Sequence, residues 1–221
     1  VLEVPSAECH FDYFGLNHLG WLREVLFEGE PQLHRVWDDD ARLTGAYRSP
    51  LFEPERLREL KLLPTEYLYY YYRPDVALAH MLQAGSSRGA AVAALTEAFF
   101  KEMSAHDLKT SSPQALNRYQ RYLADRDGSY MQIETGATAT RVKPAWAELS
   151  GYDRIALMTM RAIVHNQGAV IPLDVANEGT LNFLGADDIV EVPCRVDKDG
   201  PRPRPVATVP AHARELMERV K

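Results

Sequence analysis

An aromatic run close to the start of the sequence constrains the fold more than any other feature of the chain. Between residues 8 and 27, aromatic and β-branched side chains occur at a density that is typical of strands. The run is interrupted once, from Gly15 to His18, where glycine, asparagine and histidine occur together. We therefore predict two neighbouring strands, joined by a turn at these residues.

Helical signals dominate the middle of the sequence. Prolines, serines and acidic residues suited to the first turn of a helix mark most of the predicted starts. The predicted helices begin near Glu53, run from Pro64 to Arg73, restart at Pro74, cover Arg88 to Met103, and run from Ser112 to about Asp125. We predict irregular structure over residues 28–53 and a polar loop over residues 126–130.

The last third of the sequence returns to strands. Apolar residues between Tyr152 and Asn166 are too many for a narrow stripe, so we predict a buried helix there. Strands are predicted over residues 169–175 and 189–196, and a final helix follows the proline-rich residues 200–205. Together these patterns predict an α+β fold, in which helices cover a small mixed or antiparallel sheet.

Charge and cysteine content exclude several classes of protein. The 25 lysines and arginines are outnumbered by 31 acidic residues, and the formal net charge of −6 argues against binding to nucleic acid. The two cysteines are too few for a disulfide framework, which favours a reducing cytoplasm. No run approaches the roughly 18 to 20 apolar residues of a membrane span, and no signal-peptide pattern opens the sequence. We expect a cytoplasmic protein without a nucleic-acid or membrane partner.

Both ends of the sequence are typical of a piece of a longer protein. The first residue is Val1 rather than methionine, and the residues up to Lys221 stop inside an amphipathic helical pattern without a capping glycine. We therefore expect the chain to be a fragment.

His18 is the residue with the clearest chemical potential, and its own sequence context leaves two interpretations open. An imidazole is a common metal ligand, and the neighbouring Asn17 amide is suited to a sugar hydroxyl. A histidine at the end of a strand is also often a hydrogen-bonded structural residue. The sequence has no zinc-type ligand pattern, no serine-hydrolase elbow and no glycine-rich dinucleotide fingerprint. A ligand role for His18 would need partners from elsewhere.

Several segments, taken in order, resemble one family. The residues Gly15 to Leu19, with the aromatic residues before them, resemble the metal-binding signature of glycoside hydrolase family 4, the NAD- and manganese-dependent glycosidases. Other segments are similar to further family patterns: Leu63 to Tyr71, Arg88 to Val92, Arg126 to Tyr130, Asn177 to Leu184 and Ile189 to Cys194. The similarity spans nearly the whole chain and is nearest to the 6-phospho-β-glucosidase branch.

The resemblance implies a fold and a domain. It implies a lactate-dehydrogenase-C-terminal-like domain without its Rossmann domain. Residues 1–221 would be the C-terminal substrate- and metal-binding domain, with the N-terminal NAD-binding domain and the trailing helices absent. The glycine-rich nucleotide fold and the Cys-Asn-x-Pro metal ligand of the family have no counterpart in this sequence. We therefore expect the fragment alone to be inactive.

The resemblance also implies an activity. In the family, the C3 hydroxyl of a phosphorylated β-glucoside or disaccharide is oxidised with NAD, and a tyrosine removes the C2 proton beside a divalent metal such as Mn²⁺. The aglycone then leaves, water adds, and the ketone is reduced again. This route differs from the usual glycosidase mechanism, in which two carboxylates flank the glycosidic bond. The implied protein is a homo-oligomer.

Five residues receive roles through the resemblance. His18 matches the metal-ligand histidine, Asn17 a residue that contacts sugar hydroxyls, and Tyr67 the base. A free tyrosine has a pKa near 10, so a tyrosinate base needs a nearby cation, which the metal can supply. Arg88 and Arg126 match arginines that are suited to bind the substrate phosphate or to assist the base. Asn177 and Glu191 are assigned to turn and strand structure.

Four alternatives stay open at this point. Tyr67 can be a packed aromatic, and Arg88 a solvated arginine at a helix end. The family contains members for other sugars, such as α-galactosides or galacturonides. Finally, the chain can be a non-catalytic module whose tyrosines and aromatic strands form a binding or oligomerisation surface.

Overall fold

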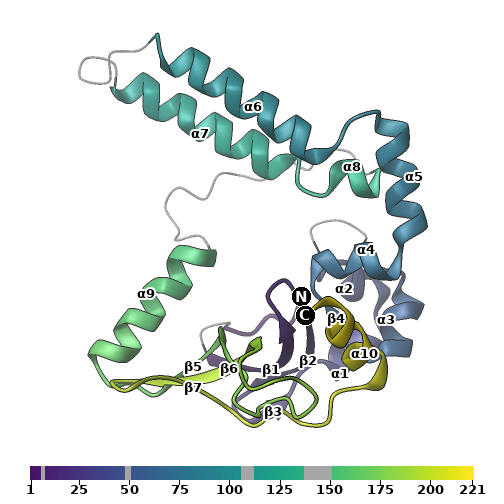
Figure 1. Ribbon diagram of the computed structural model, residues 1–221, viewed down its shortest axis with the longest axis vertical. Helices are drawn as coiled ribbons and strands as arrows, with labels where there is room; N and C mark the ends of the chain where they lie inside the picture. The colour runs from purple at the N-terminus through teal and green to yellow at the C-terminus, as the bar shows by residue number, and fades with distance from the viewer. Residues whose placement is uncertain (6–7, 48–50, 106–111, 137–150) are drawn as a thin grey trace. The chain divides into compact units, whose positions relative to one another are not determined.

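The computed structural model describes residues 1–5, 8–47, 51–105, 112–136 and 151–221. These residues form two compact units (Figure 1). Unit 1 consists of Val1–Tyr72 and Ser150–Lys221, and unit 2 consists of Arg73–Leu149. In the part of the chain that the structure covers, no helix is long and apolar enough to cross a membrane.

Unit 1 is built on a sheet in which every pair of neighbouring strands is antiparallel. The main path runs β3-β2-β1-β6-β5, while β4 pairs with β2 and β7 pairs with β6. The strands are β1 (Cys9–Leu16), β2 (Leu19–Phe27), β3 (Glu30–Pro31), β4 (Leu63–Pro64), β5 (Ala169–Ala176), β6 (Ile189–Asp197) and β7 (Gly200–Pro203). The predicted α+β class is confirmed, and the sheet is antiparallel. The bridge between β1 and β6 joins the two ends of the sequence in one sheet.

The hairpin of β1 and β2 confirms the prediction for residues 8–27. Gly15 pairs with Gly20 and Leu16 with Leu19, which leaves Asn17 and His18 as a two-residue turn. A side chain on either glycine would overlap its surroundings: the backbone of β2 beside Gly15, and the phenol of Tyr13 beside Gly20. The two glycines therefore allow the strands to approach closely just before they reverse direction.

An aromatic core anchors this hairpin. Phe14 and Trp21 are fully buried and stack with their ring centroids 5.6 Å apart. The indole N–H of Trp21 donates a hydrogen bond of 2.9 Å to the Tyr72 hydroxyl, so the large ring is buried without an unpaired donor. The packing of Phe14 and Trp21 thus fixes the two strands next to the turn.

The helices of unit 1 are mostly short. They are α1 (His34–Trp37), α2 (Asp40–Thr44), α3 (Pro54–Leu60), the 3₁₀ turn η2 (Glu66–Leu68), α4 (Tyr69–Tyr72), α9 (Gly151–Val164) and α10 (Ala211–Val220). The predicted start of a helix at Glu53 is confirmed, because Glu53 is the N-cap of α3. The predicted strands over 169–175 and 189–196 and the final helix also agree with the structure.

The prediction of irregular structure over residues 28–53 is wrong for much of that range, which contains β3, α1 and α2. The cause is local capping that periodicity does not reveal. The Glu24 carboxylate accepts hydrogen bonds from the backbone N–H groups of Gln32 and Leu33, and the Asp39 side chain caps α2 through Arg42. The predicted loop at Ser49 and Pro50 lies outside the described residues.

The prediction of one helix from Pro64 to Arg73 needs a correction. Pro64 belongs to β4, where it pairs with Trp21, and the chain then forms η2 before α4. The Thr65 backbone N–H donates to the Gly20 carbonyl, and Leu68 donates to Thr65, so the first turn is 3₁₀ rather than α-helical. The predicted break at Arg73 and Pro74 agrees with the structure.

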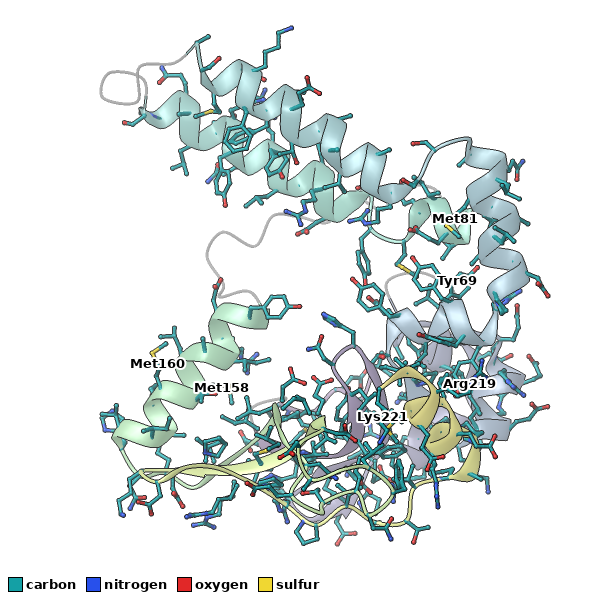
Figure 2. The ribbon with its side chains drawn as sticks, viewed as in Figure 1. Tyr69, Met81, Met158, Met160, Arg219 and Lys221 are labelled. Atoms are coloured by element: carbon teal, nitrogen blue, oxygen red, sulfur yellow. The ribbon has the colours of Figure 1, made fainter. Side chains whose placement is uncertain are left out.

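The predicted buried helix exists as α9, but its burial is wrong. Ala162 is its only buried residue among those described. Its apolar side chains are exposed, with Met160 at 54% and Val164 at 76%. The side chains of Met158 and Met160 extend from the helix (Figure 2). The apolar content therefore predicted the helix correctly, but it did not predict that most of its side chains are exposed.

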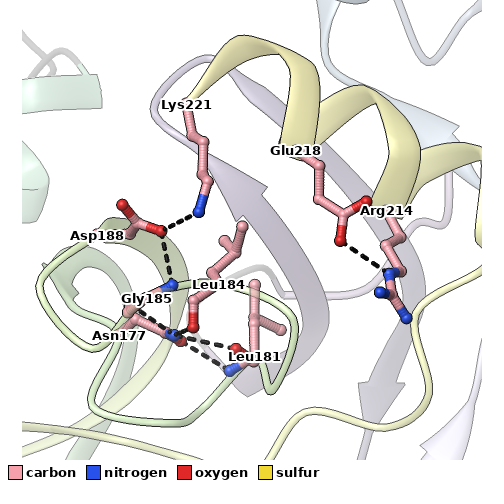
Figure 3. Close-up of polar contacts among 8 residues, drawn as sticks. All are labelled: Asn177, Leu181, Leu184, Gly185, Asp188, Arg214, Glu218 and Lys221. Atoms are coloured by element: carbon pink, nitrogen blue, oxygen red, sulfur yellow. Dashed lines mark hydrogen bonds and ion pairs between the residues drawn. The ribbon is translucent and has the colours of Figure 1, made fainter.

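The connection between β5 and β6 is organised by Asn177, as the sequence predicted for a turn residue. Asn177 is fully buried. Its side-chain N–H₂ donates to the carbonyls of Leu181, Leu184 and Gly185, and its oxygen accepts from the Leu181 N–H (Figure 3). This one amide adds to the backbone hydrogen bonds of the connection, such as that from the Asn177 N–H to the Asp188 carbonyl, and satisfies carbonyls that would otherwise be buried unpaired.

Unit 2 is helical in its described residues. It contains α5 (Pro74–Ala84), α6 (Arg88–Met103), α7 (Ser112–Gly128) and α8 (Gln132–Thr135). The bounds of α6 match the prediction, and Ser87 caps it by accepting from the Ala90 N–H. Phe99 of α6 and Tyr122 of α7 stack with ring centroids 4.7 Å apart. The predicted polar loop at 126–130 is wrong at its start, because α7 continues to Gly128.

Candidate functional site

The hairpin turn presents His18 at the surface in an unusual backbone conformation. His18 is exposed and has a φ angle of 62°, in the left-handed region that residues with a side chain seldom adopt. Thr65 fastens the turn on one side. Its hydroxyl donates 2.8 Å to the His18 carbonyl and accepts 3.2 Å from the Gly20 N–H. The imidazole is therefore carried by a fixed backbone.

Tyr67 lies beside this imidazole. It follows Thr65 by two residues on η2, so the same anchor positions both the turn and the tyrosine. The ring centroids of His18 and Tyr67 are 5.0 Å apart, at an interplanar angle of 61°. Tyr67 is 39% exposed, which leaves its ring accessible to a ligand at the surface. The structure thus brings together the residues matched to the metal ligand and the base.

Asn17 faces a pair of carboxylates on the other side of the turn. Its side-chain N–H₂ donates 2.9 Å to Asp174 on β5. Asp174 is the cross-strand partner of Glu191 on β6, and Glu191 accepts 2.7 Å from the hydroxyl of Tyr13. Burial raises the pKa of Glu191, and Asp174 raises it further, whereas Tyr13 and His18 act in the opposite direction.

Burial also raises the pKa of Tyr13, and the charges of Glu191 and Asp174 add to this shift. The phenol of Tyr13 is therefore a stable hydrogen-bond donor and not a base. Its position below Gly20 keeps it away from the exposed face of the turn.

The donor set of the turn fits one half of a metal site. Within the described ranges, no cluster of three or more histidine, cysteine or acidic side chains is suited to hold a metal ion. An exposed imidazole on a fixed turn, with acidic side chains behind it, can contribute one ligand and favourable charge. The chain can therefore share a metal but does not enclose one with these residues.

Arg88 and Arg126 belong to unit 2, and the arrangement of the two units is not determined. The Arg88 guanidinium donates 2.6 Å to the Ser129 carbonyl and 3.4 Å to the Arg126 carbonyl, and it lies over the Tyr130 ring. It therefore caps the C-terminal end of α7. The two arginines thus lie close to each other in unit 2. Asn17, His18 and Tyr67 form a separate group in unit 1.

Sequence reasoning missed four residues of this group: Thr65, Tyr13, Asp174 and Glu191. A signal was present for Glu191, since it lies between the buried residues Val190 and Val192 on β6 and must face the other side of the sheet. Asp174 and Thr65 carried no comparable signal, because their roles depend on strand pairing between distant segments.

Comparison with known proteins identifies the family. The fold is an α+β domain that carries an exposed histidine–tyrosine pair at a hairpin turn. The sequence matches the family model described as the family 4 glycosyl hydrolase C-terminal domain over residues 13–221. The chain belongs to family 4 of the glycosyl hydrolases.

The chain is similar to curated phosphoglucosidases of both anomers. It is 24% identical over 229 residues to a probable 6-phospho-beta-glucosidase of Bacillus subtilis, covering 100% of the chain and 45% of the relative. It is 25% identical over 222 residues to a phospho-alpha-glucosidase of Clostridium acetobutylicum, covering 99% and 46%. The chain therefore spans about half the length of the relatives that it matches.

Solved structures confirm the fold. The 6-phospho-beta glucosidase from Thermotoga maritima, solved with manganese, NAD⁺ and glucose-6-phosphate, matches with a TM-score of 0.57 and 18% identity over 96% of this chain and 42% of that one. A 6-phospho-alpha-glucosidase from gut microorganisms, in complex with NAD and Mn²⁺, matches with a TM-score of 0.58 and 20% identity over 98% and 46%.

Proposed function

We propose that residues 1–221 are the C-terminal substrate- and metal-binding domain of a glycosidase that hydrolyses 6-phospho-β-glucosides. The observation that carries the proposal is the edge-on pair of His18 and Tyr67, 5.0 Å apart at the exposed hairpin turn. The family model and the coverage of about half of each relative support the assignment to a C-terminal domain. The remaining part of the site would come from the rest of the protein.

The proposed cofactors are NAD and a divalent metal, which the neighbouring structures contain. When bound, NAD supplies a reversible oxidant for the sugar C3 hydroxyl and Mn²⁺ stabilises negative charge that develops on the sugar oxygens. Among the residues of this chain, His18 would hold the metal. The fixed turn keeps its imidazole in place, because Thr65 binds the His18 carbonyl.

The other residues act on the sugar. Tyr67 would remove the C2 proton, and its position beside His18 places it next to the cation that a tyrosinate base needs. Asn17 would bind a sugar hydroxyl through its side-chain oxygen, since its N–H₂ already donates to Asp174. Arg88 and Arg126 would bind the phosphate.

A substitution of Tyr67 tests the base. In the intact protein that contains this chain, Tyr67→Phe should lower kcat by about 10²- to 10⁴-fold, as expected for the loss of a general base. The dissociation constant for Mn²⁺ should stay within about twofold of the unmodified protein, because the His18 turn is retained. Steady-state kinetics and metal titration measure the two quantities.

A matched control is Tyr152→Phe, which removes the same hydroxyl from a side chain that is 77% exposed on α9. It should leave kcat unchanged. Unchanged turnover in Tyr67→Phe would remove Tyr67 from the role of base.

The isolated chain provides a second test. The 221 residues alone, supplied with NAD⁺, Mn²⁺ and a nitrophenyl 6-phosphoglucoside, should give no steady hydrolysis, since the described residues offer only part of a metal site. Sustained release of nitrophenol would show that the chain holds a complete active site.

The anomer and the phosphorylation of the preferred sugar need a separate test. The relatives include phosphoglucosidases of both anomers, and family members for α-galactosides or galacturonides are the alternative. A substrate panel on the intact protein, with each sugar in phosphorylated and unphosphorylated form, separates these possibilities. A binding or oligomerisation module without catalysis would show no turnover on any of them.

A cytoplasmic location and a homo-oligomeric assembly remain predictions. Cys9 and Cys194, the two cysteines of the sequence, are both free and buried, as suits a reducing compartment. Light scattering on the intact protein would give its oligomeric state.

A further inference from the structure

The side of the His18 turn opposite Tyr67 contains a carboxylate that sequence analysis assigned to the sheet alone. Glu191 is the cross-strand partner of Gly15, two residues before the turn. Because side chains alternate along a strand, Tyr13 and Gly15 share one face of β1. The backbone of Leu19 and Gly20 fills the place of a Gly15 side chain, so β2 lies close against β1 at the position where Glu191 pairs with Gly15.

The contacts of Glu191 fit this position. It accepts 2.7 Å from the Tyr13 hydroxyl on one side. On the other side, the backbone N–H and the imidazole of His18 both favour its ionised form. Glu191 thus links the half-buried phenol of Tyr13 to the strand end that leads into the turn, where His18 adopts a left-handed conformation.

The sheet itself gains little from this arrangement. Asp174 lies directly opposite Glu191, and two acidic side chains in such a pair destabilise a sheet. The cost is offset beside the turn, because Asp174 accepts a hydrogen bond from Asn17 and Glu191, which pairs with Gly15, accepts one from Tyr13. The two acidic residues therefore serve the turn rather than the strands.

We infer that Glu191, held by Tyr13, is a positioning residue that fixes the His18 turn for metal binding. The inference rests on the proposed role of His18 as a metal ligand. Glu191 acts through the backbone and charge of His18, and its carboxylate adds negative potential beside the cation. Partners of this kind behind a metal-ligating histidine typically account for about 10- to 100-fold in metal affinity.

The test compares Glu191→Ala, Glu191→Gln and Tyr13→Phe with the control Asp187→Asn, which alters an exposed acidic residue in the connection between β5 and β6. Hydrogen exchange at the His18 backbone amide is measured on the 221-residue chain without metal. The dissociation constant for Mn²⁺ is measured on the intact protein by the electron paramagnetic resonance signal of free Mn²⁺.

Glu191→Ala should accelerate exchange at the His18 amide by about tenfold and weaken Mn²⁺ binding by about 10- to 100-fold. Glu191→Gln keeps an oxygen acceptor but loses the charge, so it should restore most of the exchange protection and only part of the affinity. Tyr13→Phe should shift both quantities in the same direction by less, and Asp187→Asn should shift neither.

A separate variant, His18→Ala, distinguishes the two proposals. If it binds Mn²⁺ as tightly as the unmodified protein, the proposed metal role of His18 fails. If His18→Ala loses the metal while Glu191→Ala and Tyr13→Phe keep the affinity of the control, the positioning role of Glu191 is overturned and that of His18 stands. Since Tyr13→Phe leaves the carboxylate in place, it decides the question even if Glu191→Ala does not fold.

Discussion

The hairpin tip and helix α9 are both rich in apolar residues, yet these residues are buried at the hairpin tip and mostly exposed in α9. At the tip, Phe14 and Trp21 are fully buried, and the turn above them is held by Thr65. In α9, Ala162 is buried while Met160 and its apolar neighbours are exposed. Composition is similar in the two regions, so it does not decide burial.

The difference lies in what each region pairs with. The hairpin supplies its own partner, because each strand satisfies the hydrogen bonds of the other and the rings stack across the register. A helix satisfies its own backbone and needs a second surface to cover its side chains. A local sequence pattern therefore predicts both a hairpin and the side chains that it buries. For a helix, the pattern predicts the secondary structure but not which side chains are buried.

The largest effect is expected at the hairpin tip. Gly20→Ala places a methyl group against the Tyr13 phenol, and overpacking of this kind costs about 1–3 kcal/mol or more. Urea denaturation of the 221-residue chain measures the change in the free energy of unfolding.

The control for this change is Gly89→Ala at the start of α6, where the nearest atom outside the chain neighbours is 3.7 Å from the added carbon. It should be neutral or stabilise the chain by up to about 1 kcal/mol. Equal stability of the two variants would contradict the close approach of the strands at Gly20.

An intermediate effect is expected within α9, where two neighbouring positions differ in burial. Ala162→Leu forces a larger side chain into a fully buried position and should cost about 1–3 kcal/mol. Met160→Gln, at a side chain that is 54% exposed, should change the free energy of unfolding by less than about 0.5 kcal/mol. Urea denaturation of both variants checks the contrast, and a reversed order would show that the exposed face of α9 is misassigned.

The smallest effect concerns pH and a surface contact just before the start of β6. Asp188 accepts 3.0 Å from Lys221 and 2.7 Å from the Gly185 N–H, and these contacts lower its pKa below the usual value of 3.8 (Figure 3). A lowered pKa in the folded state stabilises the protein above the unfolded-state pKa, and this contribution is lost as the pH falls through the folded value.

Asp188→Asn removes the titrating group. Its Tm should therefore lie slightly below that of the unmodified chain at neutral pH, and the two should converge below about pH 4. Thermal unfolding followed by circular dichroism over this range measures the difference. A gap that widens in acid would contradict the assigned direction of the shift.

The sequence predicted more of the fold than of the site. The hairpin, the two later strands and α6 follow from strong local signals, such as the glycines beside the turn and the Ser87 cap. The 3₁₀ turn at Tyr67 does not, because the pairing of Pro64 with Trp21 imposes it from outside the segment. Glu191 likewise becomes part of the site only through its register with Gly15.

The central claim is that His18 on the hairpin turn provides a metal ligand beside Tyr67. The most direct test is a crystal structure of the intact protein with NAD and Mn²⁺, with anomalous diffraction data collected at the manganese absorption edge. We expect an anomalous peak within bonding distance of a His18 ring nitrogen, on the side facing Tyr67. A manganese ion bound elsewhere, with the His18 imidazole uncoordinated, would contradict it.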